Sequence, residues 1–215
     1  EALTARLEKA GLGAFGNGAV AEAAEVQGKK IDELRQSHFS ACKTAFEGLK
    51  SSKNKEEILP VTEMLKTFAT LWPDSGETAE AGKAVLFLDA VQNGAKAVLT
   101  IVSADFSATD SFLDTPDMKI ILKQDGKTLL ETKTVDNETR PVFGEKHEFT
   151  WDLGSHFTFV GLETGGMLGS DKEVFNVTVD AGGILGYKRL NGSLKSNGNS
   201  ITVKLETGIP ESPWN

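Results

Sequence analysis

Val98-Leu-Thr-Ile-Val-Ser-Ala-Asp105 is the stretch that decides the fold of this 215-residue chain. Along it the side chains that share a face recur at every second residue, and Val98, Thr100 and Val102 lie on one face. This period is typical of a β-strand and does not fit a helix. The sequence therefore predicts a strand of a sheet over Lys96–Ser103.

The sequence on either side predicts further strands. Met118–Lys123 and Thr128–Thr134 flank Asp125-Gly126, a dipeptide that favours a tight hairpin turn. Upstream, a period of two from Lys83 to Val91, followed by Asn93-Gly94, predicts another strand and hairpin. Additional strands are predicted at His147–Trp151, Phe157–Leu162, Val174–Val179, Tyr187–Leu190 and Ser200–Leu205. Short strands separated by Gly-rich turns indicate an antiparallel β-sandwich of about eight strands.

The N-terminal third predicts helices. They run from Ala2 to Ala10, from about Ala19 to Lys50 and from about Glu56 to Leu71, with a glycine-rich connector before the second. Asn54 is a suitable N-cap for the third. One apolar stripe at steps of three and four marks the long helix: Ile31, Leu34, His38, Cys42, Ala45 and Leu49.

A short connection between the two longer helices predicts an antiparallel helical hairpin. Two interpretations of the hairpin remain open. It either packs against the sandwich or a partner subunit, or binds lipid as an amphipathic element. Because its polar faces mix both charges and are not rich in Lys and Arg, the first interpretation is favoured.

These elements give an α+β fold class. The predicted divisions are a helical segment over residues 1–73, an acidic linker over 74–82, a β-sandwich over 83–207 and a C-terminal tail over 208–215.

Composition excludes several functions. The net charge is −8 and no basic patch is visible, so nucleic acid is not expected as a partner. Cys42 is the single cysteine and lies among apolar neighbours, which favours a buried core residue over a reactive thiol. The first residue is Glu1, not methionine, and we expect from this a processed precursor, organellar or exported.

The order of these features resembles the C2 domain family, β-sandwiches that bind calcium and phospholipid. Val98–Asp105 looks like the family's opening strand, and Thr115-Pro-Asp-Met-Lys-Ile-Ile-Leu122 resembles its Asp-Pro-Tyr-Val-Lys-Val strand. Thr132–Glu145, followed by His147-Glu-Phe149, resembles the segment before its Phe-x-Phe strand, and Gly186–Leu190 its closing segment. The resemblance covers about residues 85–206 and implies a degenerate member of the family.

The calcium-ligand pattern of the family is not preserved. On this alignment, its aspartates are replaced by Thr109, Thr115, Leu162 and Thr164. Calcium needs six to eight oxygen ligands, so several carboxylates must cluster. Five other carboxylates remain near the first and third loops: Asp110, Asp114, Asp117, Glu163 and Asp171. They constitute either a shifted, weak calcium site or solvated loop carboxylates, and no other cofactor is expected.

The tips of the same two loops carry adjacent bulky apolar residues. Phe112 and Leu113 lie in the first loop, and Met167 and Leu168 in the third. Contiguous apolar exposure tends to mark a binding surface, so these four residues are candidates for docking onto a protein or inserting into a membrane. The alternative is that they fold back over the end of the sandwich or against the helical hairpin.

The sequence offers no nucleophile elbow, phosphate loop or zinc-protease motif, and we expect no enzymatic activity. The leading hypothesis is a binding or scaffold protein, an accessory subunit of a larger assembly, that docks on a protein partner through the loop end of the sandwich. The alternative is a peripheral membrane module that binds phospholipid, either with calcium or by apolar loop insertion.

Overall fold

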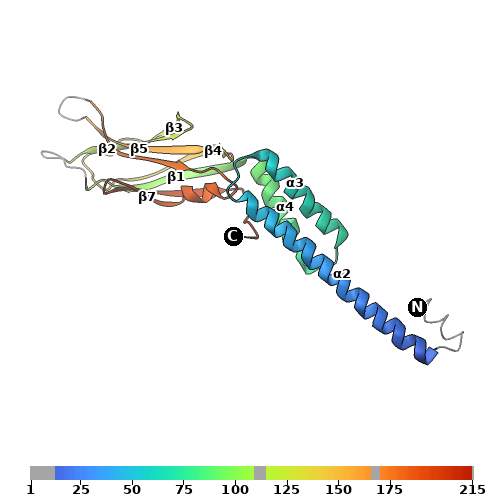
Figure 1. Cartoon of the computed structure of the whole chain (residues 1–215). Coiled ribbons are helices and arrows are strands. Elements are labelled where there is room, and N and C mark those ends of the chain that lie inside the picture. Colours follow the sequence, from blue (N-terminus) through green and yellow to red (C-terminus); the bar gives the residue numbers. More distant parts are fainter. Residues whose placement is uncertain (1–12, 109–114, 166–169, 215) are drawn as a thin grey trace.

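A computed structural model of the chain describes residues 13–108, 115–165 and 170–214. It contains a helical half and a β-sandwich half that meet end to end, as Figure 1 shows. The predicted helix over Ala2–Ala10 lies outside the described residues.

The described part of the helical half has three α-helices: α2 (Gly13–Leu49), α3 (Lys55–Leu71) and α4 (Gly76–Asn93). The two longer predicted helices are confirmed, and the Asn54 side chain accepts the Glu56 amide at 2.9 Å as the predicted N-cap of α3. The prediction of a glycine-rich connector is wrong from Gly13 onward, because α2 already begins there.

Helix α4 corrects two further predictions, the linker over 74–82 and the strand from Lys83. The period of two between Val85 and Val91 is part of a helical stripe, because the buried residues of α4 recur at steps of three, three, one and three. They are Ala81, Ala84, Phe87, Leu88 and Val91. Asn93-Gly94 is accordingly not a hairpin turn: Gly94 caps α4 with φ 75° and donates its amide to the Val91 carbonyl.

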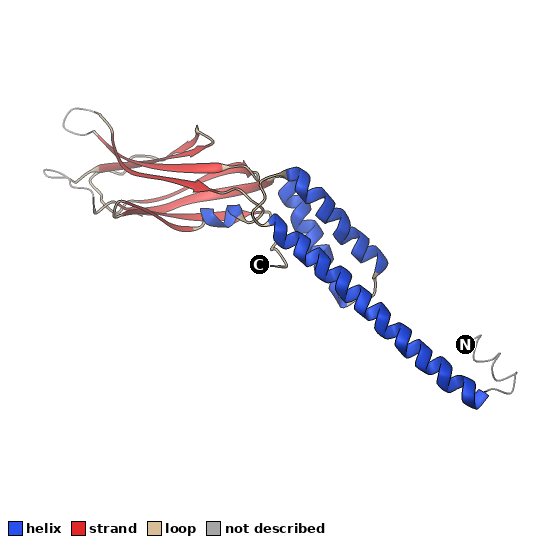
Figure 2. Cartoon of the chain, in the orientation of Figure 1, coloured by secondary structure: helices blue, strands red, loops and turns tan. Residues whose placement is uncertain are grey.

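The sandwich consists of two four-stranded antiparallel sheets within the described residues, as predicted (Figure 2). The first has the order β4 (Val142–Trp151), β1 (Ala95–Asp105), β8 (Asn199–Thr207), β7 (Gly192–Ser196). The second has the order β3 (Lys127–Glu131), β2 (Asp117–Gln124), β5 (His156–Thr164), β6 (Lys172–Asp180).

The predicted hairpin at Asp125-Gly126 is confirmed between β2 and β3, with φ of 49° and 82° at its two residues. Tyr187–Leu190 is not a strand but part of the short 3-10 helix η1 (Gly186–Leu190), and strand β7 was missed. The physical reason is that Tyr187 packs edge-on against Trp151, with ring centroids 5.5 Å apart, and so closes the end of the core.

The two halves meet where the turn between α2 and α3 packs against the segment between β6 and η1. Lys53 Nζ pairs with Asp180 Oδ2 at 2.7 Å across this junction. A Cβ on Gly183 would lie 3.0 Å from the Lys50 carbonyl oxygen, and the φ of Gly183 is +86°. Glycine there permits both the backbone conformation and the close approach.

Gly186 gives a test of the packing within the segment between β6 and η1. A Cβ at Gly186 would lie 2.0 Å from the Ala181 carbonyl oxygen, so Gly186→Ala must displace backbone. We expect a loss of ~3 kcal/mol or more in the free energy of unfolding. Gly82→Ala is the control, because a Cβ there meets nothing within 4 Å in the interior of α4. Gly82→Ala should raise the free energy of unfolding by ~1 kcal/mol, because alanine favours the helix. Urea unfolding measures both, and equal effects of the two variants would contradict the packing.

Candidate functional site

The strands that bound the first and third loops meet at the end of the sandwich that lies away from the helices. Asp117, at the start of β2, pairs with Thr164, at the end of β5. The docking candidates Phe112, Leu113, Met167 and Leu168 and the carboxylates Asp110 and Asp114 lie outside the described residues. The described residues therefore define the base of this loop end.

The three described calcium candidates do not converge. Asp117 Oδ1 accepts the Asn137 amide at 2.9 Å, Asp171 Oδ2 pairs with Lys119 Nζ at 3.0 Å, and Glu163 Oε2 lies 3.8 Å from Lys172 Nζ. Within the described ranges no group of three His, Cys, Asp or Glu side chains could hold a metal ion. Calcium binding stays a prediction that depends on Asp110 and Asp114.

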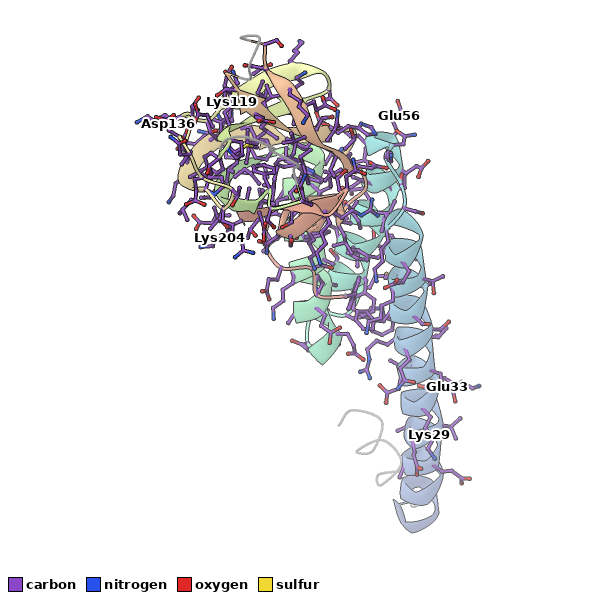
Figure 3. The ribbon with its side chains drawn as sticks, turned by 90° about the vertical axis from the view of Figure 1, so that its left-hand side faces the viewer. Lys29, Glu33, Glu56, Lys119, Asp136 and Lys204 are labelled. Carbon is purple, nitrogen blue, oxygen red and sulfur yellow. The ribbon has the colours of Figure 1, made fainter. Side chains whose placement is uncertain are left out.

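Lys119, on β2, supplies a positive charge beside these carboxylates and is labelled in Figure 3. Its ammonium contacts Glu131 at 2.9 Å as well as Asp171, and hydrogen bonds to these two carboxylates raise the pKa of the lysine. A lysine held between two acidic side chains neutralises much of the charge that a calcium ion would need.

A second polar cluster at the same end was not found from the sequence. Asp105 Oδ1 accepts both the hydroxyl and the backbone amide of Ser107, and Asp105 Oδ2 lies 3.3 Å from Arg140 Nε. The Ser107 hydroxyl, the Ser107 amide and then Arg140 lower the pKa of Asp105. An aspartate followed two residues later by serine was the available signal, because such side chains hydrogen-bond the backbone two residues on.

Asp105 also lines a polar hollow of about 480 Å³ beside the turn between β7 and β8. Lys195, Asn197 and Ser200 contribute to the same wall. Asn199, buried beneath, accepts the Ala108 amide at 3.2 Å and donates to the Val174 carbonyl at 2.9 Å, so it joins three segments at the base of the loops.

The other candidate surface lies at the opposite end of the molecule, on the part of α2 that projects beyond α3 and α4 (Figure 1). Every residue from 21 to 34 is exposed. Helix α3 ends at the level of His38, where Trp72 Nε1 donates to His38 Nδ1 at 3.4 Å. Helix α4 begins at the level of Arg35, whose Nε lies 3.6 Å from Glu77 Oε1.

The apolar stripe of α2 is consequently divided in two. Cys42 and Leu49 are buried in the helical core, whereas Ile31 is 52% and Leu34 is 64% exposed. The charged residues beside them pair within the helix: Glu25 with Lys29 at 2.7 Å and Asp32 with Arg35 at 3.2 Å. The uncovered stripe is thus bordered by both charges, and Figure 3 labels Lys29 and Glu33 on the projecting part of α2.

The hydrogen bonds of Asp105 can be tested by titration. In Ser107→Ala the side-chain hydrogen bond is lost, and the pKa of Asp105 should rise toward its ordinary value. The pKa of Asp105 is lower in the folded than in the unfolded protein. The hydrogen bond therefore contributes its full stabilisation above the unfolded pKa of about 3.9, and this stabilisation is lost as the pH falls through the folded pKa. Carbon-detected NMR titration measures the change. Ser193→Ala, on exposed β7, is the control, and an unchanged Asp105 titration in Ser107→Ala would refute the assignment.

No protein-family model and no curated protein matches the sequence. Among the described residues, no helix is long and apolar enough to cross a membrane.

The solved structures that match cover the sandwich. Human GIVD cytosolic phospholipase A2 is 16% identical over 53% of this chain, with a TM-score of 0.44. The C2A and C2B domains of Extended-Synaptotagmin 2 are 11% identical over 53% of the chain, with a TM-score of 0.43. The C2A domain of plant Extended Synaptotagmin 1 is 12% identical over 53%, with a TM-score of 0.42.

The chain spans 17% of the length of the phospholipase, 40% of the two-domain protein and 93% of the single plant domain. The β-sandwich half matches C2 domains in structure, as the sequence resemblance predicts, and three described helices precede it.

Proposed function

We propose that this protein is a non-enzymatic scaffold, an accessory subunit that attaches to a partner protein through the projecting part of α2. The loop end of its C2-like sandwich docks on a further protein. One observation carries the proposal: residues 21–34 are all exposed, and among them Ile31 and Leu34 continue the stripe that is wholly or partly buried from His38 onward.

The length of α2 supports an external partner. A helix of 37 residues extends about 55 Å, whereas the 17 residues of α3 cover about 25 Å of it. Helical stability in proteins comes mainly from tertiary packing of the apolar face. Gly13, Gly16, Gly18 and Gly28 each lower helix stability by about 1 kcal/mol relative to alanine. A partner that packs along this segment would supply the contacts that α3 and α4 do not.

The charges around the stripe favour a protein over a membrane. Helices that lie on membranes have polar faces rich in Lys and Arg. Here Glu25, Asp32 and Glu33 alternate with Lys29, Lys30 and Arg35. The matching partner surface is a second helix or a groove with an apolar centre and a polar rim of both charges.

The groups best suited to catalysis support a non-enzymatic role. Cys42 is fully buried, and burial raises the pKa of its thiol, which disfavours the reactive thiolate. The lowered pKa of Asp105 makes that carboxylate a weak base at neutral pH. At the described part of the loop end, the Lys119 ammonium is engaged by Glu131 and Asp171.

The attachment surface can be tested by changing its two apolar residues. Ile31→Asp with Leu34→Asp should abolish co-purification of the partner from the native source, because each change buries a charge in the contact. Leu86→Asp is the matched control, since Leu86 is 63% exposed on α4 and Leu34 is 64% exposed on α2. Native mass spectrometry of the complexes measures the effect.

The proposed attachment is wrong if the double variant forms an assembly of the same mass as the unmodified protein. It is also wrong if the unmodified protein is a monomer in native extract. Liposome co-sedimentation separates the membrane alternative. If the double variant loses liposome binding and Leu86→Asp does not, the surface meets lipid and the scaffold proposal is wrong.

A further inference from the structure

The C-terminal tail leaves the sandwich and returns to the helices. After β8, the Gly208 amide donates to the Lys96 carbonyl at 3.2 Å and the Ile209 amide to the Thr207 hydroxyl at 3.0 Å. Ile209 is 7% and Trp214 is 9% exposed, whereas Pro210 and Glu211 between them are exposed. The tail is therefore anchored at two points, with a solvated segment between them.

Trp214 occupies an aromatic groove between α2 and α4. Its ring lies 5.0 Å from that of Phe46, at 89°, and 5.7 Å from that of Phe39, at 73°. Edge-to-face arrangements of this kind add to the stabilisation from burial. Phe46 in turn lies 5.8 Å from Phe87 of α4, so the indole contacts the core of the helical half.

The polar edge of the indole is recognised as well. Trp214 Nε1 donates to Glu80 Oε2 at 2.9 Å, and this hydrogen bond is the main cause that lowers the pKa of Glu80. Lys43 Nζ lies 3.5 Å from the same carboxylate, 4.8 Å from the centre of the Phe39 ring and 5.5 Å from that of Trp214. The groove thus provides aromatic walls, a hydrogen-bond acceptor and a cation over the ring faces.

The tail itself has the properties of a bound peptide. Pro210 and Pro213 lack an amide hydrogen and do not extend a sheet ladder. Ser212 Oγ accepts the Trp214 amide at 3.3 Å and donates to the Trp214 carbonyl at 2.9 Å, so this polar turn is closed within the tail. The ring contacts and the hydrogen bond to the helices described above are made by one side chain of the tail, Trp214.

We propose that residues 208–214 form a releasable strap, and that the groove of Phe39, Lys43, Phe46 and Glu80 is a binding site for an extended peptide whose anchor is a tryptophan. When the strap is docked, it holds the helical half against the sandwich, in addition to the junction of Lys53 with Asp180 and the direct connection from α4 to β1. Release of Trp214 leaves those two ties and the packing of Gly183 against Lys50, and it opens the groove to the same tail of another molecule.

The occupant is well matched to reversible binding. Five residues separate Gly208 from Trp214, and so short a tether gives a high effective concentration of the indole at the groove. The cis contact is therefore populated even if the free peptide binds weakly. Loss of Trp214 should shift the molecule to a wider range of angles between its halves.

The test uses full-length Trp214→Ala and a labelled peptide of residues 207–214 added in trans. Fluorescence anisotropy should show saturable binding of the peptide to Trp214→Ala protein, with binding weaker by about tenfold or more when the peptide carries alanine in place of tryptophan. Unmodified protein, whose groove is occupied, should bind the peptide more weakly than Trp214→Ala does. Glu211→Ala protein is the control, because Glu211 is exposed in the same tail, and it should behave as the unmodified protein.

Two further measurements keep the proposal open to refutation if Trp214→Ala perturbs folding. Small-angle X-ray scattering should show a broader distribution of dimensions for Trp214→Ala than for Glu211→Ala. Trp214→Phe retains the aromatic contacts but loses the bond to Glu80, and it should bind peptide at a level between the other two proteins. The strap proposal is wrong if the peptide binds neither Trp214→Ala nor Trp214→Phe protein. It is also wrong if Trp214→Ala and Glu211→Ala proteins give identical scattering.

Discussion

The close approach of backbone to backbone at the junction of the two halves is the constraint on which the arrangement of the molecule depends. Gly183, with a positive φ, lets the segment after β6 lie against the carbonyl of Lys50, and Gly186 lies directly against the Ala181 carbonyl. The same segment accepts Trp151 Nε1 at the Ala181 carbonyl, 3.1 Å away. One short segment therefore ties the turn between α2 and α3 to the core of the sandwich.

This junction gives the protein two separated surfaces. The loop end of the sandwich is polar at its base, with Asp105 and Arg140 paired on one side and Lys119 between two carboxylates on the other. The projecting part of α2, at the opposite end, is apolar along one stripe (Figure 1). The junction therefore separates two surfaces of unlike chemistry, one polar and one apolar.

Apolar and aromatic contacts, and not ion pairs, account for most of the cohesion between the halves. Lys53 and Asp180 have side chains that are 46% and 44% exposed, and an exposed pair of this kind contributes little to stability because water screens it. The buried indole of Trp214 contributes more, because it removes a large apolar surface from water. The charged groups around it, Glu80 and Lys43, mainly determine how the ring is oriented.

The sequence by itself determined the antiparallel sandwich, the Asp125-Gly126 hairpin, the two longer helices and the Asn54 cap, because each depends on local periodicity or on the backbone preference of one or two residues. Only the tertiary structure decided the rest. Residues 85–91 carry an apolar run that fits a strand or a helix equally well, and packing against α3 resolves it as α4. The stripe of α2 is continuous in sequence, yet the end of α3 at Trp72 decides that Ile31 and Leu34 stay uncovered while Cys42 is buried.

The sequence around Trp214 predicts only a tail. Its groove exists only because α2 and α4 come together. Local preferences act over a few residues, whereas burial depends on which distant segments meet.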